Sequence, residues 1–260
     1  MIFTSPMILT AENYFSDEAD WDYMSASQYK EFQSCEARAM AELKGEWERE
    51  ETTSLLLGSY VDAHFEGTLD IFKAKHPELF KRDGSLKSEY IAAENTISRI
   101  EQDDMFMKFM AGKKQVIKTG EIDGVPFKIK MDSYHPNDMI VDLKYMKDFE
   151  PIYVKEKGRL PFFEAWGYDI QGAIYQYIEG NNLPFYIAAA TKEKVPDIGI
   201  FQIEQPDLDA CMEIIRENLP KYALLKAGIG EPARCECCDY CKHTKKLNRV
   251  ITSGEMHLYE

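Results

Sequence analysis

Two aspartates and a lysine on neighbouring predicted strands form the most informative pattern in the chain. Asp132 lies in an alternating apolar–polar run at 125–134, and Asp142 and Lys144 lie in the run that follows a Pro-Asn turn. Residues two apart on a strand point to the same face, so Asp142 and Lys144 share a face. An aspartate flanked by Val141 and Leu143 is costly to ionise without a partner, and two such carboxylates suit Mg²⁺ or Mn²⁺.

Lys144 beside such an ion would orient a water or stabilise charge that develops on a phosphate. The alternative interpretation is a surface ion pair on a half-buried strand, because an Asp-x-Lys triplet is common by chance. The apolar run before Asp142 and the second aspartate upstream favour the metal site.

A second pair of carboxylates lies on a predicted helix at 52–72. Asp62 and Glu66 are four residues apart and therefore share a helical face, whereas His64 points elsewhere. A solvated helix face is the alternative interpretation for the two acids, and an ordinary surface or core histidine is the favoured one for His64.

Four of the six cysteines cluster near the end of the chain. Cys235, Cys238 and Cys241 have the Cys-x2-Cys-x2-Cys spacing of thiolates that bind zinc or an iron–sulfur cluster. Cys237 is adjacent to Cys238 and is predicted to be spare, so a fourth ligand is missing locally. Two alternatives stay open: a zinc site that uses Cys237, and reduced thiols without a metal. Cys211 has a helical core position and is predicted to pack.

The elements that must position these residues follow from the periodicity. An Asp-Gly pair at 123–124 predicts a tight hairpin within a three-strand meander. Helical spacing surrounds this meander, and two further strands follow it. The predicted helices are 25–43, 52–72, 87–111, 161–179 and 206–227, and the predicted strands are 115–122, 125–134, 139–143, 184–191 and 198–203. This order predicts an α/β (α+β) fold, a mixed central sheet with an antiparallel meander flanked by helices.

Composition excludes several classes of protein. The 260 residues are 45% hydrophobic and 29% charged, which is an ordinary globular balance. No run approaches eighteen apolar residues, which argues against a transmembrane helix. The first residues carry no basic charge ahead of an apolar run, which argues against a secretory signal. We therefore expect a cytoplasmic protein without a membrane partner, in which clustered thiols favour metal binding over disulfides.

The formal net charge of −14 taken alone argues against a nucleic-acid partner. The charge is segregated, however. Residues 1–70 hold fifteen acidic and four basic residues, whereas 108–130 holds six lysines against two acids. A second basic run lies at 242–249. Solvated surface is the plainer interpretation of both basic runs, and net charge alone does not decide the partner.

The motifs together resemble a known family. Asp132, with Asp142-Leu143-Lys144 after a β-turn, resembles the signature of the PD-(D/E)xK nucleases. Three further segments resemble motifs of the RecB-type nuclease domain: an opening helix that ends at a cysteine, the first catalytic helix, and the Gln-x3-Tyr helix after the core. They lie at 24–35, 58–66 and 168–175. The order of these motifs is most similar to that of the RecE-like exonucleases of phages and prophages.

This resemblance implies one nuclease domain over 1–260: a helical part at 1–111, the PD-(D/E)xK core at 112–227 and a Cys-rich tail at 228–260. It implies a Mg²⁺- or Mn²⁺-dependent exonuclease that degrades double-stranded DNA ends 5′ to 3′. A homo-oligomer and a single-strand annealing recombinase as partner are also implied, in phage-type DNA recombination. The alternative is a non-catalytic DNA- or protein-binding module built round a cysteine–metal site, which accommodates the acidic first third better.

The resemblance also assigns roles to residues. Asp132, Asp142 and the Leu143 carbonyl would hold the metal, and Lys144 would position the attacking water. Relatives carry histidine where this chain has Asp62, so we expect Asp62 as the third ligand with Glu66 behind it. Gln171 and Tyr175 would border the site and contact the scissile strand; ordinary helix packing is their alternative. Cys35 would complete Cys235, Cys238 and Cys241 as ligands of a 4Fe–4S cluster or Zn²⁺.

Overall fold

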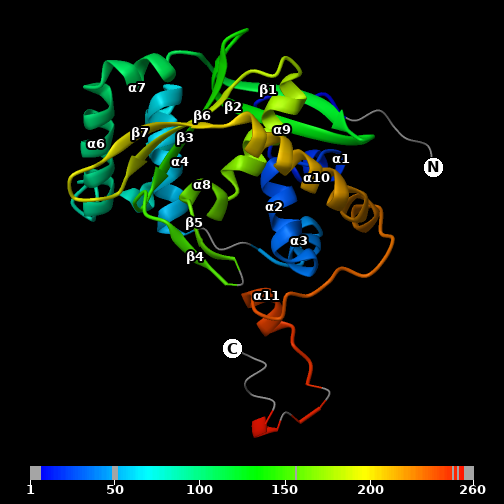
Figure 1. The fold of residues 1–260 in the computed structure, drawn as a ribbon. Helices are drawn as coiled ribbons and strands as arrows, with labels where there is room; N and C mark the ends of the chain where they lie inside the picture. Colours follow the sequence, from blue (N-terminus) through cyan, green and yellow to red (C-terminus); the bar gives the residue numbers. More distant parts are fainter. Residues whose placement is uncertain (1–6, 49–51, 156, 248, 251, 255–260) are drawn as a thin grey trace.

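A five-stranded mixed sheet forms the centre of the molecule (Figure 1). The computed structural model describes residues 7–48, 52–155, 157–247, 249–250 and 252–254. The strands lie in the order β1-β2-β3-β6-β7, and only the β3–β6 pair is parallel. Their bounds are β1 Lys113–Ile122, β2 Val125–His135, β3 Met139–Met146, β6 Phe185–Thr191 and β7 Ile198–Ile203. The predicted meander and mixed sheet are confirmed.

The hairpin between β1 and β2 forms at the predicted Asp-Gly pair. Asp123 and Gly124 both have positive φ angles, 48° and 81°. Consecutive positive φ angles produce the turn whose twist matches that of two paired strands. This turn therefore fixes the register of β1 against β2, which pairs Ile122 with Val125 at the turn and Lys113 with Tyr134 at the far end.

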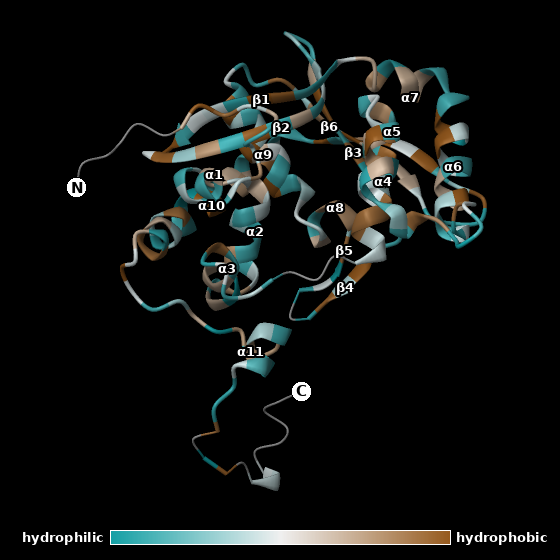
Figure 2. Cartoon of the chain, turned by 180° about the vertical axis from the view of Figure 1, so that it is seen from behind, coloured by the Kyte–Doolittle hydropathy of each residue, from teal (hydrophilic) through white to brown (hydrophobic). Residues whose placement is uncertain are grey.

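Two hydrophobic cores cover the two faces of the sheet. Ile140 and Ile187 pack on one face with α2, α9 and α10, whereas Val141 and Ala188 pack on the other with α4 and α6. This division follows the period of two along a strand, which sends neighbouring residues to opposite faces. The result is a sheet between two helical layers, and the central strands carry the hydrophobic stretches seen in Figure 2.

Most of the predicted helices are shorter than the periodicity suggests, because each is interrupted. Cys35 has an extended backbone (φ −163°, ψ 105°) and divides the first helix, while Gly67 and Gly167 adopt left-handed conformations that end or begin others. The helices are α1 Asp17–Asp22, α2 Ala26–Ser34, α3 Glu36–Leu43, α4 Thr53–Glu66, α5 Leu69–Lys75, α6 Ser88–Glu101, α7 Asp104–Phe109, α8 Phe162–Ala165, α9 Tyr168–Glu179, α10 Gln205–Lys226 and α11 Asp239–His243, with a 3-10 turn η1 at Pro77–Leu79. The continuous helices predicted at 25–43, 52–72, 87–111 and 161–179 are wrong in this respect, and the helix predicted at 206–227 is confirmed.

The periodicity missed α1, α11 and a small hairpin of β4 Ile152–Val154 and β5 Gly158–Leu160. Elements of three to six residues carry too few periods to be recognised. The tail after α10 returns to α3, where the Ala37 N–H donates to the Ala233 carbonyl (3.0 Å) and the Ala233 N–H donates to Glu36 (2.8 Å). Helices with the length and apolar character to cross a bilayer are not found in the described part of the chain.

Candidate active site

The predicted carboxylates and lysine line one cleft of about 430 Å³. Its floor is formed by β2 and β3, and its walls include α2, α3, α4, α9 and the segment before α1. The cleft brings together residues far apart in the sequence. They are Asp62 and Glu66 from α4, Asp132 from β2, Asp142 and Lys144 from β3, and Gln171 and Tyr175 from α9.

Asp132 lies where the pairing between β2 and β3 ends. The last paired residues are Ser133 and Val141, and beyond them Asp132 Oδ2 accepts a hydrogen bond from the Leu143 N–H (2.9 Å). The N–H and the carbonyl of one strand residue point to the same side. The Leu143 carbonyl therefore faces the side of β3 on which Asp132 lies, as a metal ligand at this position requires.

Asp142 is the most buried of these acids, with 3% of its surface exposed. Gln171 Nε2 donates to its Oδ1 (2.6 Å), and the Lys144 ammonium forms an ion pair with its Oδ2. Among the described residues, no donor other than this ammonium reaches the buried Oδ2. Buried acceptors are normally satisfied, and a hard cation coordinated by Asp132 and Asp142 would satisfy this one.

Burial and mutual repulsion shape the protonation of the cleft. Burial, followed by the charge of Asp142, raises the pKa of Asp132 to about 7. Burial, followed by the charge of Asp132, also raises the pKa of Asp62 well above its ordinary value. Both side chains keep some exposed surface, but their carboxyls lie deep between the walls. Clustered acids with raised pKa values are typical of a cation-binding site. A bound divalent cation would favour their ionised forms.

The environment of the cleft has the opposite effect on the charge of Lys144, since it favours the charged form of this residue. Burial alone would lower the pKa of its ammonium, but the charges of Asp142 and Asp132 raise it overall. The ammonium also lies 5.1 Å from the centre of the Tyr168 ring, within the range of a cation–π contact. Lys144 is therefore held as a cation beside the carboxylates. A fixed cation can donate to a phosphate or a water but cannot accept a proton.

The faces of α4 are arranged as the sequence predicts. Asp62 and Glu66 line the cleft together. His64 lies on another face, where its Nε2 contacts Glu101 Oε1 (2.8 Å) at the end of α6. Thr52 caps the start of α4 by accepting from the Leu55 N–H (3.3 Å), and Gly67 ends the helix.

Gln115 is a residue of the cleft that the sequence did not indicate. Its Nε2 donates to Asp132 Oδ1 (3.2 Å), while its buried Oε1 has no hydrogen-bond partner. Its φ angle of 52° is unusual for a residue other than glycine. Backbone strain of this kind is concentrated at functional sites. A glutamine in a Lys-rich strand gives no local signal, because its role depends on the strand opposite.

The structure places Gln171 and Tyr175 on the buried face of α9. Gln171 orients Asp142 through its side-chain amide, whereas the Tyr175 hydroxyl donates to the Lys130 carbonyl (3.0 Å). Tyr175 therefore anchors the backbone of β2 two residues before Asp132. These contacts support positioning of the carboxylates by both residues; contact of either side chain with a DNA strand stays a prediction.

Comparison with known proteins agrees with this geometry. A family described as "PDDEXK-like domain of unknown function (DUF3799)" matches residues 25–244. The chain belongs to this family. A crystal structure from Eubacterium rectale, described as a "putative exonuclease", is 48% identical, with a TM-score of 0.92 over 96% of this chain and 98% of that one. The crystal structure of SSO0001 is 13% identical with a TM-score of 0.28, over 83% and 95% of the two chains. No curated protein matches.

Membership of the PDDEXK-like family confirms the resemblance to PD-(D/E)xK nucleases and the predicted fold. Within this fold, the cleft over β2 and β3 contains Asp132, Asp142 and Lys144, whose assignment to the signature stays a prediction. The matched residues extend to 244, so they also include the cysteine cluster of the tail.

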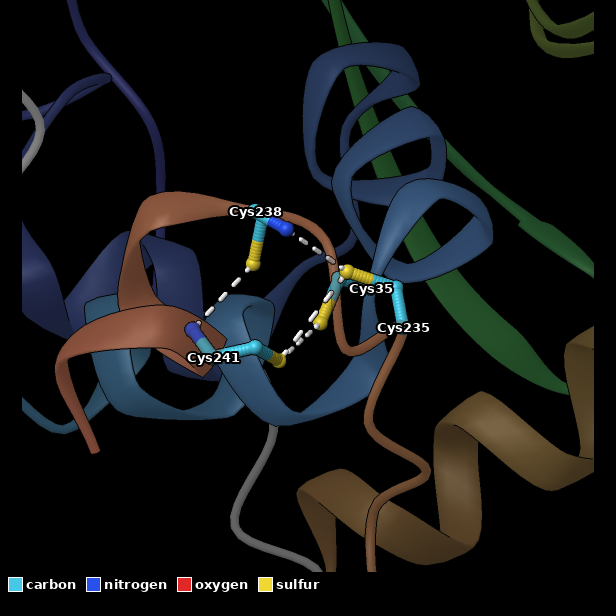
Figure 3. Close-up of side chains that lie close together, drawn as sticks. All are labelled: Cys35, Cys235, Cys238 and Cys241. Atoms are coloured by element: carbon cyan, nitrogen blue, oxygen red, sulfur yellow. Dashed lines mark hydrogen bonds between the residues drawn. The ribbon is translucent and has the colours of Figure 1, made fainter. Parts of the chain in front are cut away.

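The four cysteine sulfurs of this PDDEXK-like domain converge at the junction of α2, α3 and the tail (Figure 3). The Sγ atoms of Cys35, Cys235, Cys238 and Cys241 all lie within 4.8 Å of one another. The break at Cys35 between α2 and α3 is what presents its side chain to the tail. Cys237 is exposed and outside this group, and Cys211 is buried on α10 in the core, as the sequence predicts.

The spacing of the sulfurs suits a single tetrahedral ion. Cys35 Sγ and Cys241 Sγ are 3.6 Å apart, and Cys235 Sγ and Cys241 Sγ are 3.9 Å apart. Zinc–sulfur bonds of about 2.3 Å in a tetrahedron place sulfurs at about this separation. An iron–sulfur cluster interposes an iron at each thiolate and would hold the sulfurs farther apart. Burial raises the pKa of Cys235, but backbone N–H donors from 237 and 238 lower it to about 6 overall, which favours the thiolate.

Proposed function

We propose that this PDDEXK-like protein is a divalent-metal-dependent exodeoxyribonuclease that degrades double-stranded DNA from its ends. The proposal includes 5′ to 3′ polarity and the place of a RecE-like enzyme in phage-type recombination, beside a single-strand annealing recombinase. It also includes a homo-oligomer in the cytoplasm. The relative from Eubacterium rectale, described as an exonuclease, supports the hydrolytic part of this proposal.

The observation that carries the proposal is the buried Oδ2 of Asp142, whose one polar partner among the described residues is the Lys144 ammonium, in a cleft that Asp132 and Asp62 also line. Mg²⁺ or Mn²⁺ bound to Asp132, Asp142 and the Leu143 carbonyl would lower the pKa of a bound water and neutralise the leaving oxygen. Asp62 is the candidate third carboxylate, with Glu66 behind it on α4.

The other side chains of the cleft position the carboxylates or stabilise charge in the transition state. Gln171 fixes the plane of the Asp142 carboxylate, and Gln115 does the same for Asp132. Lys144 remains protonated in its ion pair, so it donates to the attacking water or to a phosphate oxygen. The ammonium therefore stabilises charge in the transition state and does not serve as the general base.

The cysteine site belongs to the same proposal as a structural element. Cys35, Cys235, Cys238 and Cys241 would hold one Zn²⁺, which their spacing favours, or a 4Fe–4S cluster. The ligands join α3 to the end of the chain, about 200 residues away. Metals in such sites contribute folding free energy, so this one would stabilise the domain without a part in hydrolysis.

The test is degradation of linear duplex DNA labelled at its 5′ or 3′ end, with Mg²⁺ and with EDTA. We expect Mg²⁺-dependent release of nucleotides from linear DNA and none from a closed circle. Asp142→Asn and Lys144→Met should each lower the rate at least about a thousandfold at unchanged melting temperature, as loss of a group that stabilises transition-state charge does.

Asp138→Asn is the matched control, because Asp138 lies exposed on the turn between β2 and β3 and outside the cleft lining. It should degrade DNA at the wild-type rate. Degradation that survives in Asp142→Asn at saturating Mg²⁺ contradicts the site. Binding of DNA without any metal-dependent loss would instead favour the non-catalytic binding module.

A further inference from the structure

An aromatic pair and an unpaired lysine share the cleft with the carboxylates but have no part in the proposed hydrolysis. Tyr14 and Phe15, from the segment before α1, line the cleft together with Lys130 of β2. The Lys130 ammonium lies 4.6 Å from the centre of the Phe15 ring and 5.8 Å from that of Tyr14. The two aromatic residues precede the family match, which begins at residue 25.

The aromatic pair is held in place by several contacts. Lys128, of which 1% is exposed, donates from Nζ to the Tyr14 carbonyl (2.6 Å) and to Asp20 Oδ1 (2.6 Å). Lys226 of α10 donates to the carbonyls of Asp20 (2.7 Å) and Tyr23 (2.9 Å). The segment is therefore attached at both ends of α1, and its rings are presented to the cleft in a fixed position.

Lys130 differs from Lys128 in its partners. Lys128 has a carboxylate partner, whereas no ion pair of Lys130 is found among the described residues. Both lysines and Asp132 are spaced two apart on β2, so Lys130 stands about 7 Å from Asp132 along the strand. Successive phosphates of an extended nucleic-acid strand are separated by a similar length. A phosphate at Asp132 would thus place its neighbour near the free ammonium.

The ring of Phe15 is exposed enough for a nucleotide base to stack on it. It is 73% exposed, and the buried Tyr14 supports it from the side, with ring centres 4.9 Å apart at 84°. Isolated exposed hydrophobic residues are common on protein surfaces. Phe15 differs from such residues because the Lys130 ammonium contacts its ring and because it lies in the wall of the cleft. Aromatic rings beside a basic groove bind unpaired nucleotides with little base preference, because every base has a π face.

We propose that Phe15 and Lys130 form a binding subsite for the nucleotide next to the scissile phosphate. Lys130 binds the phosphate of that nucleotide, and its base, unpaired, stacks on Phe15, which Tyr14 supports. The subsite rests on the proposed nuclease function, since the scissile phosphate defines its position. It makes the enzyme favour a frayed strand end of any sequence, because a base inside the duplex is stacked on both faces by its neighbours.

The first test combines each side-chain variant with a DNA substrate that lacks the group which that side chain is proposed to contact. Lys130→Ala should lower kcat/KM about tenfold on ordinary DNA, comparable to loss of one phosphate contact. It should have no effect on DNA with a neutral methylphosphonate at the linkage next to the scissile one. The neutral linkage is placed on either side in turn; the effect of Lys130→Ala should disappear with the linkage on one side and persist with it on the other. Phe15→Ala should likewise lose about tenfold on ordinary DNA and nothing on DNA with an abasic neighbour.

Two matched controls accompany these variants. Trp21→Ala removes another exposed aromatic ring from the same segment, and Lys81→Ala removes an exposed lysine; neither residue lines the cleft. Both should retain wild-type kcat/KM. If Lys130→Ala or Phe15→Ala loses equally on ordinary and modified DNA, or loses nothing on either, the subsite is refuted.

A binding measurement separates failure of the subsite from failure of the nuclease proposal. Anisotropy of a short labelled single-stranded oligodeoxynucleotide, recorded in EDTA, requires no hydrolysis. Lys130→Ala should reduce the slope of log affinity against log salt by about 1, and Phe15→Ala should weaken binding at unchanged slope. A wild-type protein that cleaves no DNA refutes the nuclease proposal, whereas the salt slope still tests contact of Lys130 with a DNA phosphate. An unchanged slope in Lys130→Ala refutes the subsite alone.

Discussion

Binding of Mg²⁺ in the cleft should release protons near neutral pH. The pKa of Asp132 is raised to about 7 in the metal-free protein by burial and by the charge of Asp142, and the pKa of Asp62 is raised as well. A carboxyl must ionise to bind a hard cation. The metal-free state holds protons that the metal-bound state cannot retain, so the apparent affinity must rise with pH.

The size of the effect follows from the pKa of Asp132. At pH 7 about half of these carboxyls are protonated, and at pH 6 about nine in ten. Release from Asp132 alone is thus about half a proton per Mg²⁺ at pH 7. The apparent Kd should be about fivefold larger at pH 6 than at pH 7, and the raised pKa of Asp62 makes the dependence steeper still. Acids with ordinary pKa values would give no change in this range.

Isothermal titration calorimetry measures this release directly, in two buffers of equal pH but different ionisation enthalpy. His64→Ala is the control variant, because His64 lies on α4 near Asp62 but on another face of the helix. His64→Ala should retain the full proton release, since His64 faces α6 and not the cleft. An Mg²⁺ affinity that is constant between pH 6 and 8, without proton release, would refute the electrostatic account of the cleft.

Three further outcomes are expected. Asp62→Ala should raise the half-saturating Mg²⁺ concentration about tenfold or more in the nuclease assay, whereas His64→Ala should leave it unchanged; the reverse would show that the ligand of α4 is misassigned. Cys35→Ser should abolish the bound metal in elemental analysis and lower the melting temperature by several degrees, and Cys237→Ser should change neither; intact metal in Cys35→Ser would exclude Cys35 as a ligand. Burial would raise the pKa of Glu179, but Lys118, Tyr134 and Asn181 lower it to about 2 overall. Glu179→Gln should therefore lower the free energy of unfolding at pH 7 by on the order of 2–3 kcal/mol, a difference that fades as the pH falls from about 4.5 towards 2; urea melts with an equal difference at pH 7 and pH 2 would contradict this.

The sequence by itself determined the meander and the side-chain directions within it. An Asp-Gly turn and two-residue periodicity are local properties, so β1, β2 and β3 and the shared face of Asp142 and Lys144 could be predicted. The same holds for α4, where a spacing of four residues places Asp62 and Glu66 on one face. These predictions needed only the geometry of a single strand or helix.

The sequence did not predict where the helices are interrupted. Apolar spacing continues across Cys35 and Gly67, so the periodicity alone predicts continuous helices there. The chain breaks at Cys35 because α3 packs against the returning tail, which lies about 200 residues away in the sequence. At Gly67 a left-handed residue ends α4, and glycine tolerates that conformation without requiring it.

Only the tertiary structure decided which residues complete the cleft. Gln115 contacts Asp132 because two strands lie side by side at the point where their pairing is distorted. Phe15 reaches Lys130 because the buried Lys128 of β2 and the half-buried Lys226 of α10 attach its segment to the core. Gln115 begins a predicted strand and Phe15 lies outside every predicted element, but neither belongs to a motif. Their roles arise from contacts between segments remote in sequence, and the local physics that predicts strands and helices does not contain those contacts.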